Sequence, residues 1–107
     1  MNKAFDKLPD LIQEELDASN ALHPGFHSAH EGYAVLLEEV GEAAEELDVL
    51  KSGMENLWRN VKNDNSALIP RHAGVICFHA ARMAAEAIQV AAMAQKILDS
   101  VKAGWSA

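Results

Sequence analysis

The strongest constraint on the fold is a long, mostly apolar segment in the C-terminal half of the chain. Between Ala73 and Leu98 most residues are apolar, alanine is frequent, and no proline interrupts the run. Alanine favours helix, and the absence of apolar–polar alternation argues against a strand. A helix that is apolar nearly all round is usually buried on several sides, by other helices or by a second subunit. We therefore expect an all-α protein with a long helix over about Arg71–Lys102.

Three further helical segments are predicted from apolar residues that recur every three or four positions. They cover about Lys3–Ser19, Ala29–Lys51 and Met54–Val61. Gly53 is expected to end the second segment, because glycine commonly terminates helices. No linker divides the 107 residues, so residues 1–107 are expected to form one domain. The expected architecture is a four-helix bundle that is completed by oligomerisation.

The charge of the chain limits the classes of partner. Asp and Glu number 16 against 9 Lys and Arg, a net charge of −7, and most of the acids precede residue 65. No basic stripe is present, so we expect no nucleic-acid polymer as a partner. No uninterrupted run of about 18 apolar residues occurs, so we also expect no membrane partner. A single cysteine, Cys77, makes neither an intrachain disulfide nor a cysteine-based zinc site, which favours a cytoplasmic location.

Five glutamates crowd into one stretch of the second predicted helix. On a helical wheel Glu38 and Glu45 point away from the apolar stripe, whereas Glu39, Glu42 and Glu46 form a row along its flank. Like charges at this spacing destabilise a helix by a few tenths of a kcal/mol, roughly, for each pair. Taken alone, the row is most simply interpreted as a solvated face.

Glu86 is an isolated acid that falls inside the apolar stripe of the last helix. A carboxylate buried there without a partner costs several kcal/mol, roughly, or becomes protonated. Three partners are open to it. Arg82 lies one turn before it and His79 two turns before it. The third is a metal ion shared with Glu39 and Glu42 across the helix interface.

The metal hypothesis has a defined chemistry. Gln89 follows Glu86 by three residues and adds another oxygen on the same face. Two helices would then each offer oxygen ligands at positions i and i+3. Hard oxygen donors suit Mg²⁺, and also Mn²⁺, and Mg²⁺ commonly keeps waters and substrate phosphates among its ligands. Such ligands are found in the cores of helical bundles.

At these residues the chain resembles a known family. Glu39-Val40-Gly41-Glu42, followed about forty residues later by Glu86-Ala87-Ile88-Gln89, is similar to the E-x-x-E and E-x-x-D motifs of the MazG-like all-α nucleoside triphosphate pyrophosphohydrolases. The strings His30–Glu39 and Ile88–Ala94 resemble a small phage and bacterial branch of that family. The resemblance covers roughly residues 28–98, and residues 1–27 have no counterpart that we can place.

The resemblance implies an activity and an assembly. Members of the family cleave (d)NTPs to the monophosphate and pyrophosphate with Mg²⁺ held by the four motif acids, and they form dimers or tetramers. By this resemblance the chain is a house-cleaning hydrolase of the nucleotide pool, with a nucleoside triphosphate as substrate. A homodimer or homotetramer is the implied assembly.

The family roles can be carried over to matching positions. Glu39, Glu42 and Glu86 would hold the metal, with Gln89 where the family has aspartate. The amide oxygen of Gln89 can bind Mg²⁺ but adds no charge, so we expect a lower metal affinity than four acids would give. Glu38 or Glu46 would act in catalysis, by orienting the attacking water or by holding a second ion.

Three cations are candidates for binding the phosphate oxygens of the substrate: Arg59, Lys62 and Arg82. Nothing in the sequence ranks them, and the ordinary alternative for each is a surface or salt-bridge role. The alternative function is a non-catalytic helical module, on the same scaffold, that binds nucleotide, metal or a partner. A purely structural oligomer with a solvated acidic face is the third interpretation.

Overall fold

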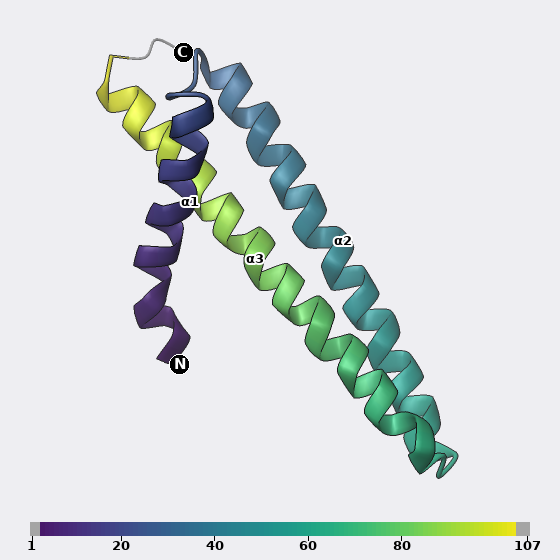
Figure 1. The fold of residues 1–107 in the computed structure, drawn as a ribbon. Coiled ribbons are helices and arrows are strands. Elements are labelled where there is room, and N and C mark those ends of the chain that lie inside the picture. Colours follow the sequence, from purple (N-terminus) through teal and green to yellow (C-terminus); the bar gives the residue numbers. More distant parts are fainter. Residues whose placement is uncertain (1–2, 105–107) are drawn as a thin grey trace. The chain divides into compact units, whose positions relative to one another are not determined.

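The computed structural model describes residues 3–104, which form helices and connecting loops without any strand (Figure 1). The α-helices are α1 (Leu8–Leu22), α2 (Ala29–Lys62) and α3 (Ile69–Lys102). Two short 3-10 helices, η1 (Lys3–Lys7) and η2 (Ser66–Leu68), precede α1 and α3. The all-α prediction is confirmed. Trp105, which the sequence predicts either to pack back on the helices or to fray, lies outside the described residues.

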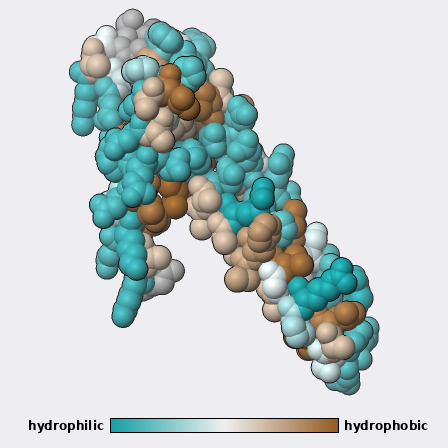
Figure 2. Space-filling view, in the orientation of Figure 1, coloured by the Kyte–Doolittle hydropathy of each residue, from teal (hydrophilic) through white to brown (hydrophobic). Residues whose placement is uncertain are grey.

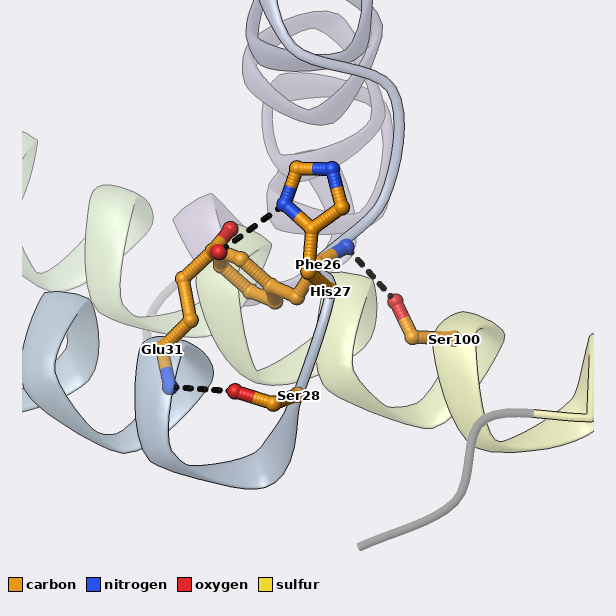
Figure 3. A network of polar contacts seen from close by, with 5 residues as sticks. All are labelled: Phe26, His27, Ser28, Glu31 and Ser100. Carbon is orange, nitrogen blue, oxygen red and sulfur yellow. Dashed lines mark hydrogen bonds and ion pairs between the residues drawn. The ribbon is translucent and has the colours of Figure 1, made fainter.

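The start of α2 follows the local sequence closely (Figure 3). The backbone N–H of Glu31 donates to the hydroxyl of Ser28 at 3.2 Å, which satisfies one of the free donors at a helix N-terminus. The carboxylate of Glu31 contacts the ring of His27 at 3.0 Å, and this hydrogen bond lowers the pKa of Glu31. The loop is held further by Phe26, whose N–H donates to the Ser100 hydroxyl at 3.1 Å.

The predicted break at Gly53 is wrong. Helix α2 continues through Gly53 to Lys62 and absorbs the segment Met54–Val61, so the described residues contain three α-helices. Gly53 is buried, and a Cβ built on it would lie 3.1 Å from Cγ1 of Ile76. The missing side chain lets α3 approach α2 closely. A bundle of four helices would need helices from a second chain, and it stays a prediction.

Gly32 allows a similar close approach, and this gives a prediction about stability. A Cβ at Gly32 would lie 2.9 Å from Cγ1 of Ile97. Gly32→Ala should therefore lower the free energy of unfolding by about 1 kcal/mol, because the cost of overpacking exceeds the gain in helix propensity. Gly74 has nothing within 4 Å of such a Cβ, so Gly74→Ala should raise stability by about 0.5–1 kcal/mol. Urea unfolding of the two variants checks the opposite signs, and equal shifts would contradict the explanation.

The chain divides into two compact units, Met1–Val40 with Glu86–Ala107, and Gly41–Ala85. The first unit holds α1, the beginning of α2 and the end of α3. Its buried apolar core is small and is surrounded by partly buried apolar side chains. The core members are Leu16, Ala92 and Met93, and those around it are Ile12, Phe26, Val35 and Leu36.

A buried lysine also ties this first unit together. Lys96 is only 3% exposed, and its ammonium donates to the Ser19 hydroxyl at 2.9 Å and lies 4.8 Å from the centre of the Phe26 ring. Burial lowers the pKa of Lys96, because the protein interior disfavours the charged form. Lys96 thereby links the end of α3 to α1 and to the loop before α2.

The second unit is an antiparallel pair made by the end of α2 and the start of α3 (Figure 1). A loop over residues 63–65, followed by η2, connects the two helices, and Asn60 Nδ2 lies 3.0 Å from His72 Nε2 across the pair. Apolar patches are visible on the surface of this pair (Figure 2). The exposed large apolar side chains here are Leu47, Val49, Met54, Trp58, Val61, Leu68, Val75 and Phe78. Cys77, which lies in the apolar run that is expected to be buried, is exposed as well.

Helix α3 bears on the expected absence of a membrane partner. Among the described residues, the helical stretch Ser66–Lys102 is long and apolar enough, by length and composition alone, to cross a membrane, and little of it is buried. The absence of an uninterrupted apolar run therefore does not exclude a membrane-spanning helix in this chain. A helix covered by partner subunits has the same composition, so the expectation of no membrane partner stays a prediction.

Candidate metal centre

Three carboxylates come together in the structure. Glu39, Glu42 and Glu86 each offer one oxygen, and these oxygens lie within 4.8 Å of one another. Glu39 and Glu86 belong to the first unit, and Glu42 follows Glu39 by one turn of the uninterrupted helix α2. Glu39 and Glu86 are half-buried, whereas Glu42 is exposed. Glu38 and Glu45 point outward and are exposed, as the helical wheel predicts.

Neither of the protein cations considered for Glu86 pairs with it. His79 and Arg82 both bind Glu46 instead: Nδ1 of His79 lies 2.6 Å from one carboxylate oxygen, and Nε of Arg82 donates to the other at 2.7 Å. Within residues 3–104, the side chain of Glu86 makes no hydrogen bond or ion pair. Of the three partners open to Glu86, two are therefore engaged by Glu46, and the shared cation stays a prediction.

The donor set of the cluster fits a small divalent cation. Three like-charged groups this close repel each other by about 1 kcal/mol per pair even at the dielectric constant of water. An ion with metal–oxygen distances of about 2.0–2.1 Å joins oxygens up to about 4.2 Å apart, so small side-chain movements would bring all three to one ion. All three donors are hard carboxylate oxygens, which suits Mg²⁺ or Mn²⁺.

The fourth residue of the expected ligand set, Gln89, has a partner that the sequence did not reveal. Its side-chain nitrogen donates to a carboxylate oxygen of Glu15 at 2.6 Å. Glu15 lies on α1, in the part of the chain that has no counterpart in the family resemblance. The one local signal is its place beside the buried Leu16, and periodicity alone does not distinguish it from its acidic neighbour Glu14.

Glu46, a candidate catalytic residue, pairs with two side chains of α3 and not with the three-carboxylate cluster. Its side chain is 13% exposed, and it is not a member of the cluster. The hydrogen bonds from His79 and then from Arg82 lower the pKa of Glu46. Glu46 therefore joins α2 to α3 within the second unit. Of the two catalytic candidates, Glu38 is the one that stays exposed to solvent.

The lowered pKa of Glu46 predicts an acid-sensitive contribution to stability. A carboxylate whose pKa falls on folding stabilises the protein above its ordinary value of 4.5, and this stabilisation is lost as the pH falls below 4.5 through the folded pKa. Glu46→Gln should therefore be less stable than the wild type at pH 7 and should lose less stability on acidification. The exposed Glu45→Gln is the control. Urea midpoints at pH 7 and at about pH 3.5 measure the difference, and parallel curves for all three proteins would contradict it.

The phosphate-binding candidates are separated by the length of α2. Arg59 and Lys62 lie about 25 and 30 Å along the helix from Glu42, at about 1.5 Å per residue, so the structure does not bring them to the cluster. Arg59 donates to the Asn56 side chain at 3.1 Å, and the Lys62 ammonium lies 5.6 Å from the centre of the exposed Trp58 ring.

Arg82 is the candidate cation nearest to the cluster. It lies one turn before Glu86 on α3, and Glu46 fixes its Nε. Its side chain is 57% exposed and lies over the Phe78 ring, with 5.7 Å between Cζ and the ring centre. Arg82 is therefore anchored at one end while much of its surface stays open to solvent.

Comparison of the chain with protein-family models, with curated proteins and with solved structures finds no match.

Proposed function

We propose that the chain is a Mg²⁺-dependent nucleoside triphosphate pyrophosphohydrolase that cleaves (d)NTPs to (d)NMPs and pyrophosphate and cleans the nucleotide pool. The observation that carries the proposal is the cluster of Glu39, Glu42 and Glu86, in which the side chain of Glu86 has no hydrogen-bond or ion-pair partner within residues 3–104. The motif resemblance to the MazG-like enzymes supports the same substrate class. Mn²⁺ would be accepted at the same oxygen donors.

The residues of the site would have separate roles in hydrolysis. Glu39, Glu42 and Glu86 hold the ion, which when bound supplies positive charge to the triphosphate oxygens and to the attacking water. The water oxygen forms a bond to the α-phosphorus, the bond from that phosphorus to the bridging oxygen breaks, and pyrophosphate leaves. Glu38, exposed beside Glu39, orients the water and accepts its proton.

Arg82 is the residue that we propose for contact with the substrate phosphates. It stands one turn from Glu86, and Glu46 fixes the Nε end of its guanidinium. A guanidinium held in this way binds phosphate oxygens with a smaller loss of side-chain freedom than an unanchored one.

The exposed apolar surface supports a homodimer or homotetramer as the working form. Among the described residues the buried apolar core is limited to Leu16, Ala92 and Met93, while Trp58 and Phe78 are 59% and 58% exposed. Apolar surface of this extent usually marks an interaction site. Sedimentation without detergent should give a multiple of 11.6 kDa. A monodisperse monomer would contradict the assembly, and a protein soluble only with detergent would indicate a membrane partner.

The test of the activity is incubation of the purified protein with Mg²⁺ and a panel of NTPs and dNTPs, with the products separated by anion exchange. Equal amounts of monophosphate and pyrophosphate are expected from at least one substrate. A diphosphate with orthophosphate would contradict the proposal. Turnover of none of the substrates, with a Mg²⁺-dependent rise in melting temperature, would favour a non-catalytic binding module. That alternative is favoured by the uncharged Gln89, which is bound to Glu15.

A further inference from the structure

A side chain of helix α1 contacts α3 one helical turn from Glu86, a member of the candidate metal centre. The half-buried Glu15 accepts a 2.6 Å hydrogen bond from the side-chain nitrogen of Gln89, which lies one turn after Glu86 on α3. The position of α1 is fixed beside this contact, because Leu16 is 4% exposed in the core and Ser19 accepts a hydrogen bond from Lys96. All of these residues lie in the first unit.

The chemistry of this contact sets the orientation of the amide. An ionised carboxylate only accepts hydrogen bonds, so Glu15 engages the nitrogen of Gln89 and leaves the oxygen at the other end of the amide. A charged acceptor on the nitrogen also polarises the amide and increases the negative charge on its oxygen. Residues that orient metal ligands in this way commonly determine metal affinity.

We propose that Glu15 is a positioning residue of the metal centre. It holds Gln89 so that the amide oxygen completes the ligand set with Glu86, and its own negative charge compensates for the carboxylate that Gln89 lacks. This inference rests on the proposed function, because it requires a divalent cation at Glu39, Glu42 and Glu86. It gives the segment before residue 28 a role in the site, although the family resemblance does not extend there.

A purely structural clamp between α1 and α3 makes a different prediction. Loss of such a clamp would lower the stability of the protein and leave its metal affinity unchanged. Loss of a positioning residue weakens metal binding even where the protein stays folded. Metal affinity, measured without nucleotide, therefore separates the two roles.

The experiment is calorimetric titration of the full chain with Mg²⁺, repeated with Mn²⁺. Glu15→Gln, which keeps the shape and removes the charge, should raise the Kd by about tenfold. Glu14→Gln, an exposed neighbour on the same helix, should leave the Kd unchanged. In a Gln89→Asp background, Glu15→Gln should no longer weaken binding, because Glu15 then has no amide to orient and would only repel the new carboxylate.

The possible outcomes separate the role of Glu15 from the existence of the metal centre. An unchanged Kd for Glu15→Gln, with binding abolished in Glu86→Gln, would overturn the role of Glu15 and leave the metal centre standing. No Mg²⁺ or Mn²⁺ binding by the wild type would overturn both. If Glu15→Gln does not fold, Gln89→Met replaces it. That variant lacks the amide and should bind the metal more weakly, and wild-type affinity in it would overturn the inference.

Discussion

Glu86→Gln is expected to lose at least about a hundredfold of the Mg²⁺-dependent release of pyrophosphate, because it removes one of three charged metal ligands. The same variant should fold as well as the wild type or better. A neutral amide at a half-buried position avoids both the desolvation cost of the carboxylate and its repulsion by Glu39 and Glu42. Initial rates at saturating Mg²⁺, with urea unfolding in EDTA, measure the two effects.

The control for this variant is Glu45→Gln on α2. Glu45 is exposed and lies outside the three-carboxylate cluster, so its rate and its stability should match those of the wild type. Wild-type activity in Glu86→Gln would remove this residue from the metal centre. A large loss of stability without an effect on metal binding would show instead that Glu86 supports the fold and does not bind the metal.

Leu16→Ala should lower the free energy of unfolding by about 2–5 kcal/mol, which is a large part of the total stability of a small domain. Leu16 is 4% exposed and is one of three buried apolar residues in the described core. The cavity left at this site would loosen α1 against α3. Urea unfolding at constant protein concentration measures the loss.

Leu22 offers a matched comparison on the same helix. It is 78% exposed, so Leu22→Ala should change stability by less than about 0.5 kcal/mol. Similar losses in the two variants would show that burial within one chain does not determine the contribution of these side chains. In that case the exposed surface of α1 would itself be covered, most simply by a second copy.

Local sequence predicts most of the secondary structure of this chain, because periodicity and capping act over a few residues. The helical periodicity predicts the start of α2 and both ends of α3 to within two residues, whereas α1 begins five residues and ends three residues later than predicted, after the 3-10 helix η1. Ser28, with Glu31 three residues later, is a local pattern typical of a helix start, and α2 begins there. Gly53 fails as a stop signal because its role depends on Ile76, which lies on another helix. Glycine at a close helix contact and glycine at a helix end look alike in one sequence.

For the candidate site, too, local sequence predicts part of the arrangement and the packing of the helices determines the rest. Helical wheels place Glu39 and Glu42 on one flank of α2 and Glu86 within the stripe of α3, and the structure brings the three carboxylates together. The wheels do not give the register between α2 and α3. The structure is therefore needed to show that His79 and Arg82 pair with Glu46 rather than with Glu86.

The contribution of α1 was beyond prediction for a related reason. The contact between Glu15 and Gln89 joins residues 74 positions apart, and neither belongs to a pattern that identifies the other. The same holds for the exposure of Phe78 and Cys77, which the apolar composition of α3 predicts to be buried. Composition predicts that these apolar side chains are buried. It does not predict whether the same chain or another subunit buries them.

Glu39, Glu42 and Glu86 together hold one divalent cation in the function that we propose. The most direct test of this is calorimetric titration of Mg²⁺ into the nucleotide-free wild type and into Glu39→Gln and Glu86→Gln, with Glu45→Gln as control. We predict one ion per chain for the wild type and the control, and at least about tenfold weaker binding in each of the other two variants. Equal binding by all four proteins, or none by the wild type, would contradict the claim.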